Sequence, residues 1–230
     1  MTISIIIPTL NEAENISRLI HLLHELGNEH VKEIIIVDGG STDDTVAVAS
    51  RPWTLVSTSP NKGRAAQMNY GASMASGDIL YFIHADSLPP AGFATDIIKS
   101  IEDGYLLGRY QTKFDSDKWI LKVNAFFTRF DLFVCYGGDQ TLYITARLFK
   151  ALAGYNEKLT IMEEYDLVSR AKGLAKYKVM RAVVLVSARK YNANSWWKVQ
   201  RVNYKIVQMY KRGVSPDVML KRYNELISYR

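Results

Sequence analysis

Residues 79–86 read Ile-Leu-Tyr-Phe-Ile-His-Ala-Asp, an apolar run that ends in a histidine and a carboxylate. A Gly-Asp pair precedes the run and a Pro-Pro pair follows shortly after it, so the pattern predicts a buried strand that leads into a turn. Two earlier apolar runs, residues 3–7 and 34–37, also end in polar turns. Because ligands of an open α/β sheet bind outside the carboxyl ends of its strands, these three turns predict one shared site.

Candidate strands and helices alternate up to about residue 104, which is typical of a parallel sheet with crossover helices. After the first strand, Asn11 and Glu14 have the spacing of a helix-capping pair, and Ile or Leu recurs at helical spacing as far as Leu26. We expect a further helix from Ala65 to Ala75. The predicted fold class is therefore α/β, with a mostly parallel sheet flanked by helices.

The second half of the chain is less regular. The pattern predicts a strand over residues 105–114, an amphipathic aromatic segment over 118–133 and a helix from about Thr145 that Gly154 ends. Near the C-terminus, the pair Asn194-Ser195 is the expected cap of a helix that stops at Gly213. A helical C-terminal extension is therefore predicted.

The composition is that of a globular protein, because 48% of the 230 residues are hydrophobic and 23% are charged. No apolar stretch approaches the roughly 20 residues that span a bilayer, and the first apolar run lacks the basic leader and the length of a signal peptide. The single cysteine, Cys135, is expected to be a packed thiol rather than a nucleophile. With no repeat or flexible linker, we expect one cytoplasmic domain over residues 1–230.

Positive charge is concentrated in the last part of the chain. Residues 189–230 contain ten Lys or Arg against Asp217 and Glu225, so this tail carries +8 while the whole chain carries +6. A basic tail on a near-neutral body predicts an anionic partner, such as a phospholipid surface or a phosphorylated ligand. No nucleic-acid partner is expected, because no motif beyond charge supports one.

The aromatic segment 118–133 and the basic, Trp-rich helix after Ser195 are suited to a peripheral position on the inner face of a membrane. That position would suit a lipid-linked substrate. The alternative is that both helices bury their apolar sides in the protein and expose a basic face to solvent, as amphipathic helices usually do.

Two aspartates at the predicted strand ends are candidate binding residues. Asp86 could hold a divalent cation beside a bound diphosphate, since Mg²⁺ takes one or two protein carboxylates together with phosphate oxygens and water. Asp38 could accept hydrogen bonds from a nucleobase or ribose, and the glycines that follow it let a ligand approach the backbone. The alternatives are a helix N-cap or solvated turn for Asp86 and an ordinary turn for Asp38.

Two further charged clusters are candidates for chemistry. Residues 62–64, Lys-Gly-Arg, form a basic loop before a predicted helix and could meet a phosphate or base, although surface Lys and Arg are usually only solvated. Residues 163–166, Glu-Glu-Tyr-Asp, include carboxylates that could raise one another's pKa and act as a general base. The alternative for this second cluster is the charged first turn of a helix that runs to Lys172.

Six motifs occur in order along the chain: Pro8–Glu12, Asp38–Asp43, Gly63-Arg64, Gly77–Leu80, His84–Asp86 and Glu163-Glu164. In order and separation they resemble the family 2 glycosyltransferases of the GT-A fold, up to about residue 186. Residues 63–69 and 84–86 are most similar to a small soluble bacterial subgroup labelled transferase 2, radical-SAM/selenodomain-associated. The resemblance implies inverting transfer of a sugar from a nucleoside-diphosphate sugar, expected to be UDP-linked, to an unidentified acceptor hydroxyl.

The resemblance assigns roles on the donor side. The nucleotide-binding positions are Pro8, Thr9, Glu12, Asp38, Gly63, Arg64 and His84. Asp86 matches the last carboxylate of the family's Asp-x-Asp motif, which holds Mn²⁺ or Mg²⁺ on the donor diphosphate. His84 stands at the first position of that motif, where the family has Asp, and it adds no negative charge. A weaker metal site or a different ribose contact is the expected consequence.

The resemblance also assigns an acceptor side. Glu164 matches the family's catalytic base, with Glu163 or Asp166 as substitutes, and Gly138, Asp139 and Gln140 are weaker acceptor-side candidates. The expected division is a nucleotide-sugar-binding half over residues 1–104, an acceptor half over 105–188 and the basic helical tail over 189–230.

Other classes of function remain open at the level of sequence. A Rossmann oxidoreductase is disfavoured, because the first strand ends in Pro-Thr-Leu-Asn-Glu rather than Gly-x-Gly-x-x-Gly. A nucleotidyltransferase uses a related sheet and metal but needs no base for a sugar acceptor. A nucleotide-sugar-binding, membrane-associated protein without catalysis is the non-enzyme alternative.

Overall fold

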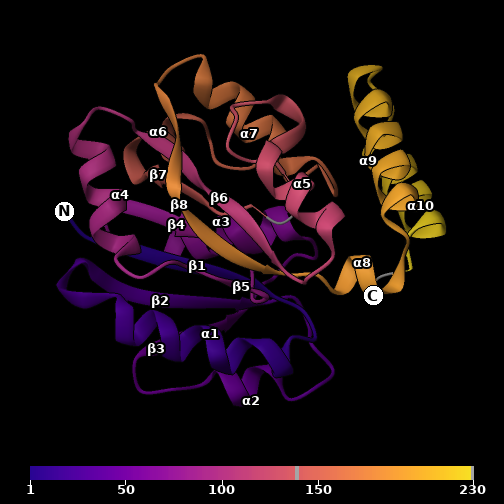
Figure 1. The fold of residues 1–230 in the computed structure, drawn as a ribbon. Coiled ribbons are helices and arrows are strands. Elements are labelled where there is room, and N and C mark those ends of the chain that lie inside the picture. Colours follow the sequence, from indigo (N-terminus) through magenta and orange to yellow (C-terminus); the bar gives the residue numbers. More distant parts are fainter. Residues whose placement is uncertain (138–139, 229–230) are drawn as a thin grey trace.

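The apolar runs that begin near residues 3, 34 and 79 form three adjacent strands of one eight-stranded sheet (Figure 1). The computed structural model describes residues 1–137 and 140–228, and within them the strand order is β3-β2-β1-β4-β7-β6-β8-β5. The strands are β1 (Ile3–Thr9), β2 (Val31–Asp38), β3 (Thr54–Thr58), β4 (Ile79–Phe82), β5 (Ser87–Leu88), β6 (Leu107–Asp115), β7 (Leu142–Thr145) and β8 (Tyr177–Ser187).

The strand order reverses at β1, which pairs in parallel with β2 on one side and with β4 on the other. β7 is antiparallel to both β4 and β6, and β8 is parallel to β6. The carboxyl ends of β1, β2, β4 and β8 therefore lie at the same edge of the sheet. In open α/β sheets, the place where the strand order reverses is where ligands bind.

β1 is an interior strand of the sheet, and every one of its residues is buried. A strand that is covered on both faces reads as a nearly continuous apolar run, as residues 3–7 do with Ser4 as the one exception. Pro8 lies beyond Ile6, the last residue of β1 that pairs with β4, so its missing N–H interrupts no bond to β4.

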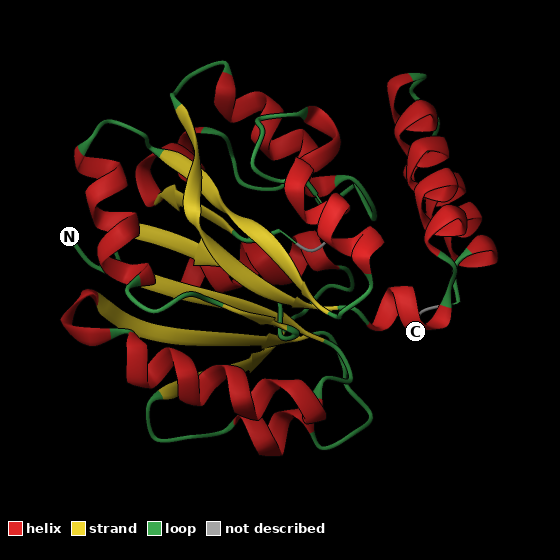
Figure 2. Ribbon diagram, viewed as in Figure 1, coloured by secondary structure: helices red, strands yellow, loops and turns green. Residues whose placement is uncertain are grey.

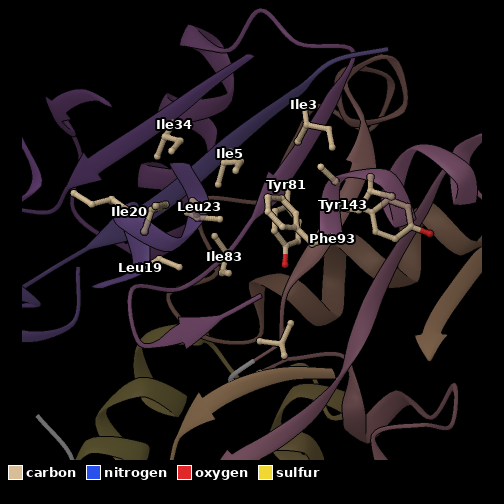
Figure 3. Packing of buried hydrophobic residues seen from close by; sticks show 14 of the residues in the cluster. Ile3, Ile5, Leu19, Ile20, Leu23, Ile34, Tyr81, Ile83, Phe93 and Tyr143 are labelled. Carbon is tan, nitrogen blue, oxygen red and sulfur yellow. The ribbon is translucent and has the colours of Figure 1, made fainter. Parts of the chain in front are cut away.

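Helices cover both faces of the sheet (Figure 2). One face is packed by α1, α2 and α4, and the other by α3, α6 and α7. The first core includes Ile3, Ile5, Leu19, Leu23 and Tyr81, which lie close together in Figure 3. The bounds are α1 (Ala13–Leu26), α2 (Thr45–Ala49), α3 (Arg64–Met74), α4 (Phe93–Glu102), α5 (Trp119–Phe127), α6 (Ala146–Ala151), α7 (Glu163–Lys172), α8 (Arg189–Ala193), α9 (Trp196–Lys211) and α10 (Pro216–Leu226), with 3₁₀ turns η1 (Asn28–His30) and η2 (Phe133–Cys135).

The C-terminal extension is a helical hairpin, with α9 and α10 side by side at the right of Figure 1. Its apolar side forms a third cluster in which Val199, Val202 and Ile206 of α9 join Leu121 of α5 and Met219 of α10. None of the helices in the described part of the chain is both long enough and apolar enough to cross a membrane.

Most of the elements expected from the sequence are present, and two expectations need correction. The side chain of Asn11 does not cap α1, which begins after Glu12; its Oδ1 instead accepts a hydrogen bond from the N–H of Thr42 at 2.8 Å. In the aromatic segment 118–133, helix α5 ends at Phe127. The helix expected from Thr145 is confirmed, because the Thr145 side chain caps α6 by accepting from the N–H of Leu148.

Helix α3 packs directly on the strands β1 and β2 at Gly71. A Cβ atom added to Gly71 would lie 2.5 Å from Cγ2 of Ile6 and 3.0 Å from Cγ2 of Val37, both of which are fully buried. The absence of a side chain therefore lets the helix approach the sheet closely.

We predict that Gly71→Ala destabilises the protein, because overpacking a tight core typically costs about 1–3 kcal/mol, more than Ala gains over Gly in a helix. Urea unfolding measures this loss. Gly173→Ala is the control, because its Cβ would meet only the carbonyl oxygen of Arg170, at 3.3 Å. Equal stabilities of the two variants would contradict the proposed packing.

Candidate active site

Asp38 ends β2 and lies opposite Thr9 in the parallel pairing with β1. Its side chain is buried, and the turn that follows it supplies its hydrogen bonds. Oδ2 accepts from the N–H groups of Gly40 at 2.8 Å and Ser41 at 2.9 Å, and Oδ1 accepts from Oγ of Ser41 at 2.5 Å. The predicted nucleotide-binding carboxylate is therefore held in a fixed position at the edge of the sheet.

Gln67 of α3 joins the ends of β1 and β2. Its Nε2 donates to the carbonyl oxygens of Thr9 and Val37, both at 2.8 Å. Gly39 faces this amide so closely that an added Cβ would lie 3.0 Å from Nε2. Gly63, which precedes the helix, has φ +109°, a backbone conformation that favours glycine. This backbone geometry places Arg64 at the N-terminus of α3.

Arg189 connects two of the predicted site residues. It follows β8 at the start of α8, and its Nη1 donates to Oε2 of Glu12 at 3.0 Å while its Nη2 donates to Glu12 Oε1. The same Nη2 lies 3.1 Å from Oδ2 of Asp86. Three strand ends, those of β1, β4 and β8, are therefore joined by one guanidinium group.

Sequence reasoning placed Arg189 only in the general positive charge of the tail. The sequence feature that could have identified Arg189 is its position just after an apolar strand, the same feature that singles out Asp38 and Asp86. That strand was not predicted, so its end could not be used.

The predicted base Glu164 lies beside His84. Both Glu163 and Glu164 are buried in the first turn of α7, and Nε2 of His84 is 3.0 Å from Oε1 of Glu164. Because His84 follows β4 by two residues, this contact brings the start of α7 to the carboxyl edge of the sheet. His84, which stands where the family's Asp-x-Asp motif has its first Asp, therefore contacts the candidate base Glu164.

Glu163 pairs with Arg64, whose Nη1 lies 3.5 Å from its Oε1. Burial raises the pKa of Glu163; Arg64 opposes this rise and the neighbouring Glu164 adds to it. The carboxylates of residues 163 and 164 thus have different partners, one from α3 and one from the turn after β4.

The other acceptor-side candidates are engaged elsewhere or are not described. Asp166 pairs with Arg170, and Arg170 also donates to the carbonyl oxygens of Leu152 and Gly154. Oε1 of Gln140 accepts from buried Arg109 at 3.0 Å. The candidates Gly138 and Asp139 lie outside the described residues.

The residues at this edge fit a divalent cation that arrives with a diphosphate. Within residues 1–137 and 140–228, no three His, Cys, Asp or Glu side chains are grouped to hold a metal ion by themselves. Asp86 supplies a carboxylate, the ligand type that Mg²⁺ and Mn²⁺ prefer, and these ions commonly complete their coordination with phosphate oxygens and water. A cation at Asp86 would therefore depend on its nucleotide.

Several relatives of established name share part of the sequence. Glucosyl-3-phosphoglycerate synthase of Mycobacterium tuberculosis (strain CDC 1551 / Oshkosh) is 38% identical over 99 residues, which are 39% of this chain and 30% of that protein. An undecaprenyl-phosphate 4-deoxy-4-formamido-L-arabinose transferase of Pseudomonas syringae pv. syringae (strain B728a) is 27% identical over 127 residues, 51% of this chain and 38% of that protein. The matches thus span about a third of the length of these relatives.

Solved structures share the fold over most of the chain. Glucosyl-3-phosphoglycerate synthase from M. tuberculosis, in complex with Mn²⁺, UDP and phosphoglyceric acid, superposes with a TM-score of 0.65 at 20% identity, covering 93% of this chain and 79% of that one. TarS residues 1–349 of S. aureus with UDP-GlcNAc gives 0.69 at 17% identity, covering 97% and 72%. This likeness confirms the expected GT-A fold.

The family model for glycosyl transferase family 2 matches residues 4–154, well over half of the chain. The matched region includes Thr9, Asp38 and Asp86 at or just after strand ends, and Arg64 at the start of α3. The chain therefore belongs to glycosyl transferase family 2.

Proposed function

We propose that this protein is an inverting glycosyltransferase that moves a sugar from a nucleoside-diphosphate sugar to an acceptor hydroxyl. The observation that supports it most is the gathering of Asp38, Arg64, Asp86 and Glu164 around one edge of the sheet, where the strand order reverses. Solved relatives with the same fold hold UDP, UDP-GlcNAc or GDP-Man. We propose UDP as the nucleotide of the donor.

On the donor side, Thr9, Pro8 and Asp38 form the nucleotide wall at the ends of β1 and β2. Arg64, at the N-terminus of α3, has a guanidinium that is one-third exposed and can pair with a phosphate. Asp86 would hold Mn²⁺ or Mg²⁺, and such a cation, when bound, stabilises the negative charge of the departing nucleoside diphosphate. These groups lie within residues 1–104, the proposed donor half.

On the acceptor side, Glu164 takes the proton of the attacking hydroxyl. A base must lie within hydrogen-bond reach of the proton it removes and must be held in position, and His84 Nε2 holds Oε1 of Glu164 at 3.0 Å. As the acceptor oxygen forms its bond to the anomeric carbon, the bond from that carbon to the diphosphate breaks. Attack on the side opposite the leaving group inverts the anomeric configuration.

Glu163 and Asp166 are less suitable as the base. Glu163 is paired with Arg64, so we propose that it positions this arginine for the donor. Asp166 pairs with Arg170 and so connects α7 to the turn after α6. Both carboxylates thus support the site, and Glu164, held by the imidazole of His84, is the base that we propose to meet the acceptor within the proposed acceptor half, residues 105–188.

We also propose that the protein works at an anionic membrane surface, on the inner face, with a lipid-linked acceptor. Trp119, Phe126, Phe127 and Phe130, on α5 and just after it, are 44–72% exposed. The guanidinium of Arg129 lies 4.1 Å from the centre of the Phe126 ring. Exposed aromatic rings beside basic side chains are typical of interfacial segments.

We predict that Glu164→Gln lowers the rate of UDP release from a UDP-sugar by about 10²–10⁴-fold, since general-base catalysis contributes this much. UDP-glucose and UDP-GlcNAc serve as donors, with Mn²⁺ present. The acceptors are a polyprenyl phosphate, for the proposed lipid-linked acceptor, and 3-phosphoglycerate, the acid bound by a solved relative. Thermal shift with UDP should be unchanged in the variant, because the carboxyl group of Glu164 is not proposed to bind the nucleotide.

Glu25→Gln, on the exposed side of α1, is the matched control and should keep the wild-type rate. A Glu164→Gln protein with the full rate would refute the assignment of the base. Absence of any thermal shift with every nucleoside diphosphate would count against the glycosyltransferase itself.

We predict that Glu163→Gln alters the pH dependence of stability. The pKa of Glu163 is raised above its ordinary value of 4.5, so the wild-type protein loses stability as pH rises from about 4.5 through the pKa in the folded state. The variant lacks this loss, so its free energy of unfolding relative to wild type should increase across the same pH range. Urea unfolding at a series of pH values measures the difference, with Glu25→Gln as control; a difference that is flat with pH would contradict the prediction.

We predict that the protein floats with vesicles rich in phosphatidylglycerol but not with pure phosphatidylcholine. Replacing Phe126 and Phe127 with Ser should lower the vesicle partition coefficient at least about tenfold, since burial of one Phe side chain contributes about 1.5–3 kcal/mol. Leu174→Ser, at a 67% exposed position on the loop after α7, is the control for lost surface hydrophobicity. Flotation that is equal in all three proteins would exclude the aromatic patch as the contact.

A further inference from the structure

The cation proposed for Asp86 competes for this carboxylate with a positive group of the chain itself, the guanidinium of Arg189. Nη2 of Arg189 lies 3.1 Å from Oδ2 of Asp86, and the Asp86 side chain is only 8% exposed. A buried carboxylate needs a counter-charge, and Arg189 supplies one. The guanidinium is also bound to both carboxylate oxygens of Glu12, so it is held beside Asp86 from a second direction.

A divalent cation and this guanidinium compete for the carboxylate of Asp86. Mg²⁺ binds carboxylate oxygens at about 2.0–2.1 Å, which would put it within a few ångströms of Nη2 if Arg189 stayed in place. Two positive groups at that separation repel each other strongly in a partly buried site. Metal binding at Asp86 is therefore weakened for as long as Arg189 stays in place.

Arg189 can exchange Asp86 for another anionic partner when a donor arrives. Its side chain is 39% exposed, which is far more than that of Glu12 or Asp86. A guanidinium pairs with phosphate oxygens through two parallel hydrogen bonds, so a diphosphate at this edge offers a replacement for Asp86.

We propose that Arg189 and the divalent cation are alternative counter-ions of Asp86, and that the donor diphosphate makes the exchange by drawing Arg189 onto its phosphates. This inference rests on the proposed function for the identity of the diphosphate. Its consequence is an order of binding: the free protein has little affinity for the cation, and nucleotide and cation increase each other's affinity.

The test is Mn²⁺ binding to the nucleotide-free protein, followed by electron paramagnetic resonance of the free ion. Arg189→Gln should bind Mn²⁺ at least about tenfold more tightly than wild type, within the range typical of coupled sites. Adding Asp86→Asn to Arg189→Gln should remove the gain. Arg181→Gln, which deletes an exposed arginine of β8, is the matched control and should bind like wild type.

A second variant keeps the proposal testable if Arg189→Gln does not fold. Arg189→Lys keeps the positive charge but lacks the fork that engages Glu12 and Asp86 together, so its Mn²⁺ affinity should lie between those of wild type and Arg189→Gln. Circular dichroism confirms that each variant is folded.

With UDP present, the affinity of wild type for Mn²⁺ should rise about tenfold or more, and that of Arg189→Gln should rise less. Equal Mn²⁺ affinities of nucleotide-free wild type and Arg189→Gln would overturn the proposal, as would a gain that survives Asp86→Asn. These outcomes do not depend on sugar transfer, so they separate a failure of this exchange from a failure of the glycosyltransferase assignment.

Discussion

The parallel pairing of β1 with both β2 and β4 is the constraint on which the site depends. It sets Thr9 opposite Asp38 and directs the turn after β4 to the same edge, so residues that are distant in sequence become neighbours. β8 adds its own end there, because two antiparallel steps through β7 restore the direction of β4 in β6 and β8. No single loop could hold these groups, since each is fixed by a different strand.

Charge balance is a second property of this edge. The carboxylates of Glu12 and Asp86 share Arg189, Glu163 faces Arg64, and Glu164 faces His84. Such partners offset part of the cost of burying these acids, so the edge is charge-balanced before any ligand binds. A ligand that carries a diphosphate enters a set of ion pairs that it can rearrange, rather than a group of unpaired charges.

Much of this organisation could be predicted from the sequence, because it depends on local pattern. Continuous apolar runs fixed β1, β2 and β4, and the polar residues just after them pointed to Thr9, Asp38 and Asp86. The contacts between distant elements could not be predicted in this way. Neither the pairing of His84 with Glu164 nor that of Arg189 with Glu12 has a signature in spacing. The apolar run 182–186 of β8 is a local signal, but its strand is not among those predicted.

The correction at Asn11 has the same origin. The spacing of Asn11 and Glu14 is that of a cap, but the Asn11 side chain has a tertiary partner in the turn after β2, and that partner prevails. Rules based on local spacing therefore predict a segment correctly when its contacts are mainly within the segment. They fail where the ends of two strands contact each other.

The position of Arg189 also affects how the chain can be divided. The basic helical tail, taken from composition, begins at this residue, yet its first side chain belongs to the edge of the sheet rather than to the hairpin of α9 and α10. Truncation at the apparent boundary would leave Glu12 and Asp86 without the arginine that they share. The helical hairpin is thus joined through α8 to the edge of the sheet that carries Glu12 and Asp86.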